Sequence, residues 1–462
     1  MAANRREIGQ AGQESSSSGR RLGALELTGL GVGSIIGAGF FLGSGIVIHQ
    51  VGPAILLTYL LGGLAMAQVM GAITSLAVNV PVKTSYQEYI AQYLGAYPGF
   101  FLGWAVFASG ALCIGSEAVA MAEYSRYWLP TVPVGAFAVG YVLLVVLLNS
   151  FGVESLGKVE TLMSVVKAGI LVVFVSVALV LVAGVARTPQ TVGLTVLLGR
   201  GGFFPKGILP VFSGMLIVVF SYAGVTTVAM ATAQARHPRE SVPRAADYTT
   251  FIIAGLYVLS LLSLLLLAPW DTLTASRSPF VAALQGVRYF GLARMVNVVI
   301  LIASFSVMAG AFYAVQWMLV GLAGQGDAPA RFRQRGRLRP YPALLATSLT
   351  VLVTLVLAFV LPRSVYTDLT AASSYFTFVN WLFILLAFLA WHHGSQAPRA
   401  RLSRLAFAPP YGALATVAVV AALGAYSVTV QAFQLGFWVF LGISLGITVA
   451  WGFQRGRRAP AS

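Results

Sequence analysis

The chain has 462 residues, of which 58% are hydrophobic and 9% are charged. A soluble domain of this length carries far more charge, so the composition excludes a soluble globular protein and predicts an all-α polytopic membrane protein. The net charge of +16 is better explained by orientation in the lipid bilayer than by nucleic acid binding. The single cysteine excludes disulfides and structural zinc sites within the chain.

Residues 1–23 form the first predicted segment. Two acidic residues, Glu7 and Glu14, and the serine run 15–18 are not typical of a cleavable signal peptide. This polar composition instead predicts a disordered tail, which we place in the cytoplasm.

The first apolar span contains a glycine at every second to fourth position from Gly29 to Gly45. Glycine weakens helices, so its frequency here requires a reason other than stability. Gly37 and Gly39, on either side of Ala38, allow the backbone to leave the helix within the membrane and present amide groups to a polar ligand. We therefore predict a broken helix at Ile36–Gly39 that binds an anionic group. The alternative is that the glycines permit only close helix packing.

Two ionisable side chains lie well inside predicted spans. Glu117 is in the third span and Lys167 is in the fifth. Burying either charge alone is costly, so we expect the two side chains to face each other. Such a pair can exchange a proton as the cavity wets and dries, and its lysine could replace a sodium ion. The alternative is a static ion pair that fixes helix packing.

The sixth span contains the second predicted break, at Phe220, Ser221, Tyr222, Ala223 and Gly224. Hydroxyl groups and a glycine in the middle of a span favour interruption of the helix. Carbonyl groups at this break could accept hydrogen bonds from a substrate ammonium. A zwitterion that bridges the two breaks would satisfy both sets of backbone groups.

Twelve apolar segments of spanning length are predicted, which places both ends of the chain on one side of the membrane. Most of the 29 basic residues then fall in loops on the side of the termini, which predicts that both termini are cytoplasmic in a multi-pass cell membrane protein. The second break follows the first by five spans. Because five is odd, we predict a 5+5 inverted repeat with broken helices 1 and 6.

These predictions divide the chain into segments. The inverted-repeat transport core is 24–391, with the first repeat at 24–186 and the second at 205–391. Helices 11 and 12 occupy 408–454, and 455–462 is a second cytoplasmic tail.

No nucleotide-binding, zinc-protease or serine-hydrolase motif is found in the sequence, so we predict no enzymatic activity, no metal and no cofactor.

The motifs around both breaks resemble those of amino acid permeases of the amino acid–polyamine–organocation superfamily. The first motif is Gly33 to Phe41, which is similar to the G-x-I-G-x-G-x-F pattern of the first helix in that family. The second runs from Phe220 to Gly224 and continues through 234–244, and the third is 323–329, at the end of the eighth span. The resemblance covers nearly the whole chain after residue 20.

The resemblance implies the five-plus-five fold and uptake or exchange of amino acids. Lys167 matches a lysine of helix five in the family and Glu117 matches a glutamate of helix three in related permeases, which implies coupling to protons rather than sodium. Relatives often have acidic residues in helix six where this chain has Thr226 and Gln234. Their absence favours neutral substrates.

Three functions are consistent with these observations. The first is a proton symporter of amino acids that works by alternating access. The second is an exchanger of amino acids, or of an amino acid and its amine, without net proton flux. The third is a membrane receptor that senses amino acids without moving them.

Overall fold

The computed structural model describes residues 22–80, 86–150, 156–185, 191–273, 277–334, 340–360, 365–394 and 402–458. These residues are almost entirely helical, and the regions between helices contain one isolated parallel β-bridge, which joins Leu22 to Ala235. The predicted tail at 1–23 therefore lies outside the described residues, except for its last two positions.

The helices of the first half are α2 (Ala24–Ile35), α3 (Ala38–Phe41), α4 (Gly43–Val51), η1 (Gly52–Ala54), α5 (Ile55–Asn79), α6 (Gln87–Leu94), α7 (Ala96–Ser125), α8 (Val134–Ser150), α9 (Leu156–Val182) and α10 (Leu194–Leu198). Those of the second half are α11 (Leu209–Ser221), α12 (Thr227–Met230), η2 (Ala231–Gln234), α13 (Pro238–Leu267), η3 (Trp270–Thr272), α14 (Pro279–Gly286), α15 (Phe290–Gln325), η4 (Ala330–Phe332), α16 (Tyr341–Val360) and α17 (Val365–His392). The chain ends with α18 (Tyr411–Ser427), η6 (Gln431–Phe433) and α19 (Gln434–Arg458).

Eight helical segments among the described residues are long and apolar enough to cross a membrane. Four shorter apolar helices accompany them: α2, α8, α11 and α18. Two of these, α2 and α11, are short because a break interrupts the predicted first and sixth spans. The all-α polytopic membrane architecture is confirmed, while the total of twelve spans and the inverted repeat stay predictions.

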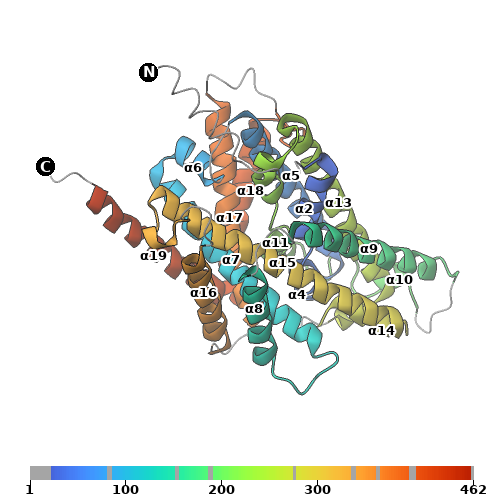
Figure 1. The fold of residues 1–462 in the computed structure, drawn as a ribbon. Coiled ribbons are helices and arrows are strands. Elements are labelled where there is room, and N and C mark those ends of the chain that lie inside the picture. Colours follow the sequence, from blue (N-terminus) through green and yellow to red (C-terminus); the bar gives the residue numbers. More distant parts are fainter. Residues whose placement is uncertain are drawn as a thin grey trace.

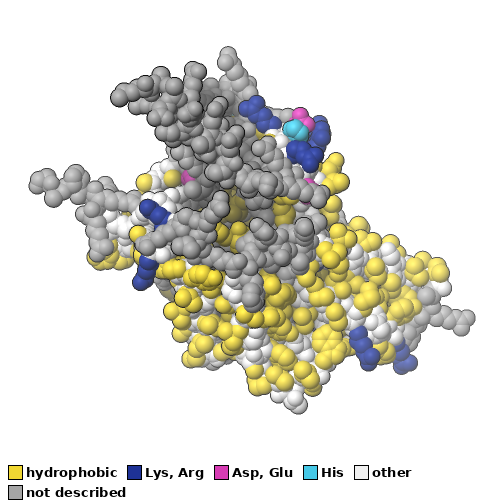
Figure 2. Space-filling model, viewed as in Figure 1, with side chains coloured by type: hydrophobic (Ala, Val, Ile, Leu, Met, Phe, Trp, Pro, Cys, Tyr) yellow, Lys and Arg dark blue, Asp and Glu magenta, His cyan; other side chains and the backbone are white. Residues whose placement is uncertain are grey.

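The surface of the molecule fits a lipid environment. On the face shown in Figure 2, hydrophobic side chains form a broad continuous area, and the visible Lys and Arg side chains lie at its margins. On α16, Leu345, Leu349 and Val356 are each more than half exposed. Burial of such side chains in hydrocarbon is favourable, whereas their exposure to water is not.

The helices that carry the predicted site pack against one another in the interior. Helix α7 packs against α8, α15 and α17, and α13 packs against α2, α5 and α9. Figure 1 shows α7, α11, α15 and α17 crossing near the centre of the molecule, with α9, α10 and α14 extending to one side and α19 to the other.

The division of the chain into two repeats and two further helices stays a prediction, and the structure gives only the helix bounds near its boundaries. Helix α9 ends at Val182, α11 begins at Leu209 and α17 ends at His392. Helix α19 continues to Arg458, so the first residues of the predicted tail at 455–462 are helical and the last four lie outside the described residues.

Candidate functional site

The first span is interrupted at Ile36 and Gly37. Helix α2 ends at Ile35, Ile36 has φ −75° and ψ 102°, and Gly37 has φ −148° and ψ −161°. Both residues are therefore extended, and α3 begins at Ala38. Any residue adopts these angles, so the requirement for glycine at position 37 is one of space: a Cβ there would lie 2.8 Å from Glu117 Oε1 and 3.0 Å from Val307 Cγ2.

The sixth span is interrupted over a longer stretch. Helix α11 ends at Ser221, residues 222–226 form turns, and α12 begins at Thr227. Gly224 has φ +93°, a left-handed conformation that L-residues with a side chain rarely adopt. A Cβ at Gly224 would also lie 2.6 Å from the Ser34 carbonyl oxygen. Glycine is therefore required at this position both by conformation and by space.

The two interrupted spans contact each other directly. The Ser221 hydroxyl donates a hydrogen bond of 2.6 Å to the Gly39 carbonyl. A Cβ at Gly39 would lie 2.8 Å from the Phe220 ring and 3.0 Å from the Ser221 Cα. Gly39 therefore allows the start of α3 to pack against the end of α11.

A break in a helix leaves backbone groups without their usual partners, because each carbonyl of an α-helix accepts from the amide four residues later. At the first break the Gly33 carbonyl is one such group. The Lys167 ammonium, which is fully buried on α9, donates to it over 2.7 Å. On the same face of α2, the Ser164 hydroxyl donates to the Gly29 carbonyl over 2.7 Å.

The Ala38 amide is the corresponding donor on the other side of the break. It donates to both carboxylate oxygens of Glu117, each at 3.1 Å. Glu117 lies on α7 and is 2% exposed. The structure therefore brings Lys167 and Glu117 to the same break, one to a carbonyl before it and the other to an amide after it.

Four buried tyrosines form hydrogen bonds around the two breaks. The Tyr257 hydroxyl on α13 lies 3.2 Å from the Ile35 carbonyl and 3.2 Å from the Ser221 carbonyl, so it contacts one carbonyl of each break. Tyr366 donates to the Ala38 carbonyl at 2.9 Å. Tyr59 lies 3.0 Å from the Ser221 hydroxyl, and Tyr222 donates to the Tyr59 carbonyl at 2.9 Å.

Aromatic rings surround these hydrogen bonds. The rings of Phe40 and Tyr257 are stacked, with centroids 3.8 Å apart and an interplanar angle of 2°. Phe280 of α14 packs against Phe40, Phe41 and Phe174. The polar groups of the breaks therefore lie in an apolar setting, where an unmade hydrogen bond is expensive.

The structure gathers the predicted site residues around these two breaks. Ile36 and Gly37 form the first break, and Ala38 and Gly39 begin α3. Phe220 and Ser221 are the last residues of α11, while Tyr222, Ala223 and Gly224 lie in the second break.

Tyr257, Tyr366 and Tyr59 were missed in the sequence-based prediction of the site. A tyrosine within an apolar span is a usable signal, because a buried phenolic hydroxyl requires a partner. The sequence alone does not identify that partner.

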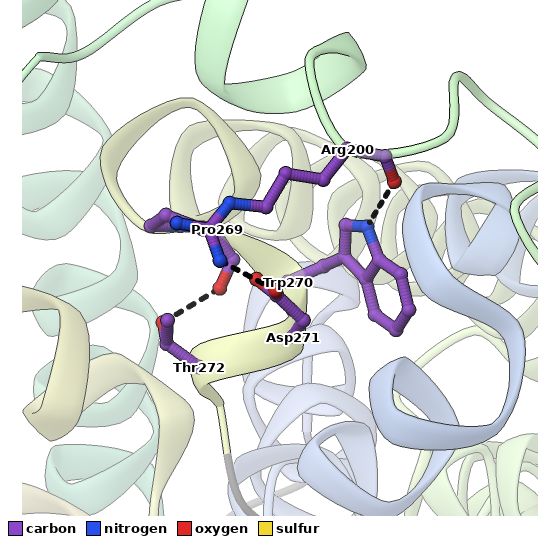
Figure 3. Close-up of polar contacts among 5 residues, drawn as sticks. All are labelled: Arg200, Pro269, Trp270, Asp271 and Thr272. Carbon is purple, nitrogen blue, oxygen red and sulfur yellow. Dashed lines mark hydrogen bonds and ion pairs between the residues drawn. The ribbon is translucent and has the colours of Figure 1, made fainter.

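A cavity of about 770 Å³ lies elsewhere, between α10, η3 and α14. None of the described residues that line it belongs to either break. At its edge the Arg200 guanidinium pairs with Asp271, and the Trp270 indole donates to the Arg200 carbonyl over 3.1 Å (Figure 3). The ion pair is partly exposed, with side chains 52% and 37% accessible, and exposed pairs of this kind contribute little stability.

Two relatives with similar sequences are transport proteins. The γ-aminobutyric acid permease of Bacillus subtilis (strain 168) is 30% identical over 376 residues, which are 81% of this chain and 80% of that protein. The aromatic amino acid transport protein AroP of Salmonella typhimurium (strain SL1344) is 28% identical, over 89% of this chain and 90% of that protein.

A solved structure shares the fold. The manganese transporter of Eremococcus coleocola superposes with a TM-score of 0.57 and 14% identity, over 94% of this chain and 95% of that chain. The family model for amino acid permeases matches residues 27–447. The chain therefore belongs to the amino acid permease family, within the amino acid–polyamine–organocation superfamily.

Proposed function

We propose that this permease is a secondary transporter that moves neutral amino acids across the cell membrane by proton symport and alternating access. The observation that supports it best is the meeting of two interrupted spans in the interior, with a buried carboxylate and a buried ammonium bonded to the first of them. Interrupted helices that meet in a membrane interior are typical of substrate sites in transporters.

In this proposal the backbone amides at Gly37–Gly39 bind the substrate carboxylate, and the carbonyls at Phe220–Ala223 bind its ammonium. The partners of the protein are then an amino acid, protons and the lipid bilayer. Both termini lie in the cytoplasm, as the distribution of basic residues favours.

The substrate is neutral in this proposal because the described part of the second break has no acidic side chain to pair with a cationic substrate. The aromatic side chains nearby, including Phe40, Phe220 and Tyr222, favour an apolar or aromatic substrate side chain. The names of the relatives suggest γ-aminobutyrate and aromatic amino acids as the first substrates to test.

Lys167 and Glu117 are the proposed proton-coupling residues. Both are buried, so a change in the protonation of either alters the hydrogen bonds at the first break. A protonation change at the break is thereby linked to the conformation of the substrate site.

The test is uptake of labelled γ-aminobutyrate and L-phenylalanine into proteoliposomes with an imposed pH gradient. The Lys167→Gln variant keeps a hydrogen-bond donor for the Gly33 carbonyl but cannot lose a proton. We expect it to retain substrate binding and to lose uptake driven by the pH gradient. The matched control is Lys206→Ala, which removes an exposed lysine and is expected to leave uptake unchanged.

Each alternative function predicts a different result in the same assay. Uptake that requires substrate inside the vesicle and is insensitive to pH indicates an exchanger. Binding without uptake under any gradient indicates a receptor. Gradient-driven uptake that persists in Lys167→Gln contradicts the proton-coupling role of this residue.

A further inference from the structure

We propose that Glu117 and Tyr257 occupy the substrate's hydrogen-bonding positions when the site is empty, so that an amino acid binds by displacing both side chains. The inference rests on the function proposed above, in which the two breaks hold a zwitterion. It adds a role for Tyr257 and a second role for Glu117.

The carboxylate position is occupied by Glu117. Both of its oxygens accept from the Ala38 amide at 3.1 Å, in a place where the residue is 2% exposed. Oε1 would also lie 2.8 Å from a Cβ at Gly37, so the carboxylate lies directly against the extended backbone of the break. A substrate carboxylate bound to that amide would need the same space and the same donor.

The ammonium position is occupied by the Tyr257 hydroxyl. It lies 3.2 Å from the Ile35 carbonyl and 3.2 Å from the Ser221 carbonyl, one from each break. A hydroxyl has a single proton to share between two acceptors, whereas an ammonium has three. An ammonium between these carbonyls would therefore satisfy both at once, and with stronger charge-assisted hydrogen bonds.

The arrangement has a physical reason. A backbone amide or carbonyl that is buried without a partner is costly, and an empty site built from two breaks would leave several. Glu117 and Tyr257 remove that cost in the empty protein. The two side chains also compete with the substrate. The free energy of binding is therefore the free energy of the substrate's contacts minus that of the internal contacts that are lost.

This competition gives Tyr257→Phe a distinctive signature. The phenylalanine ring retains the stacking on Phe40 but leaves both carbonyls without their internal donor. We expect the empty variant to melt at a lower temperature. We also expect the Kd for the amino acid to fall by about five-fold, the factor that corresponds to one neutral hydrogen bond.

The control for this variant is Tyr375→Phe. Tyr375 is a buried tyrosine on α17 whose hydroxyl accepts from Ser427 over 3.2 Å, and it contacts neither break in any described hydrogen bond. Its loss removes a buried hydroxyl of the same kind, so it should lower the melting temperature without changing the Kd.

Glu117→Gln tests the carboxylate position. The glutamine keeps the shape of the side chain and one acceptor, but it bonds the Ala38 amide less strongly because it is uncharged. We expect a lower Kd for the amino acid and little change for the matching amine that lacks a carboxylate. The control on the same helix is Glu123→Gln, which removes a partly exposed partner of Arg126.

The measurement is isothermal titration of the purified full-length protein with γ-aminobutyrate, L-phenylalanine and each remaining standard amino acid, followed by phenethylamine and the other matching amines. A Kd that is unchanged or higher in both Tyr257→Phe and Glu117→Gln overturns the inference but leaves the proposed function intact. If the wild-type protein binds no amino acid in this panel, the proposed function fails, and the inference fails with it.

Discussion

The two breaks interrupt their helices by different means. The first spans two extended residues, Ile36 and Gly37, and is bonded by two ionisable side chains from α7 and α9. The second spans five residues in turns, contains the left-handed Gly224, and is bonded by hydroxyl groups. The difference indicates that ionisable groups are concentrated at the first break, whereas the second depends on a backbone conformation that favours glycine.

This contrast assigns different tasks to the breaks in our proposal. The groups that can change protonation, Glu117 and Lys167, both form hydrogen bonds to the backbone of the first span. The turns of the second break supply carbonyls and hydroxyls, whose protonation does not change near neutral pH. Protonation or deprotonation should therefore change the hydrogen bonds of the first break. The hydrogen bond between Ser221 and Gly39 should then transmit this change to the second break.

The largest stability effect is expected for Gly224→Ala. The left-handed conformation by itself costs a residue with a side chain about 1–3 kcal/mol, and the new Cβ would also meet the Ser34 carbonyl oxygen at 2.6 Å. We expect a lower melting temperature in detergent and loss of substrate binding. The control is Gly255→Ala in α13, where a Cβ meets nothing within 4 Å. Equal melting temperatures for the two variants would show that the second break does not require glycine at position 224.

An intermediate effect is expected for Gly39→Ala. The Cβ would lie 2.8 Å from the Phe220 ring and 3.0 Å from the Ser221 Cα, so α3 and α11 must move apart. Overpacking of this kind costs about 1–3 kcal/mol, and binding should weaken more than stability because both halves of the site shift. Titration calorimetry and thermal unfolding measure the two effects, with Gly310→Ala on α15 as the control, since its Cβ meets nothing within 4 Å. Unimpaired binding would show that the contact between the breaks does not shape the site.

The smallest effect is expected at the cavity beside Arg200. Asp271→Asn removes an ion pair whose side chains are 52% and 37% exposed, and exposed pairs are worth about 0–1 kcal/mol. We expect nearly unchanged stability at low and high salt and an unchanged Kd for the amino acid. A large change in Kd would indicate that the cavity takes part in substrate binding. This result would contradict the assignment of the substrate site to the two breaks.

Several features of the site are predictable from the sequence because they depend on local chemistry. The low charge content requires a membrane environment, and the glycines around Ala38 favour an interruption that the structure places at Ile36 and Gly37. Glu117 and Lys167 stand out because an ionisable group in a long apolar segment is costly unless it has a partner. None of these inferences requires knowledge of which helices are neighbours.

The partners in the site depend on tertiary structure. Lys167 bonds to Gly33 and Glu117 to Ala38, and Tyr257 joins Ile35 to Ser221 across α2, α11 and α13. These residues are far apart in the chain, and only helix packing brings them within hydrogen-bonding distance. The sequence of a single span indicates that some backbone groups lose their helical hydrogen bonds at a break. Which side chains bond to those groups instead is decided by the neighbouring helices.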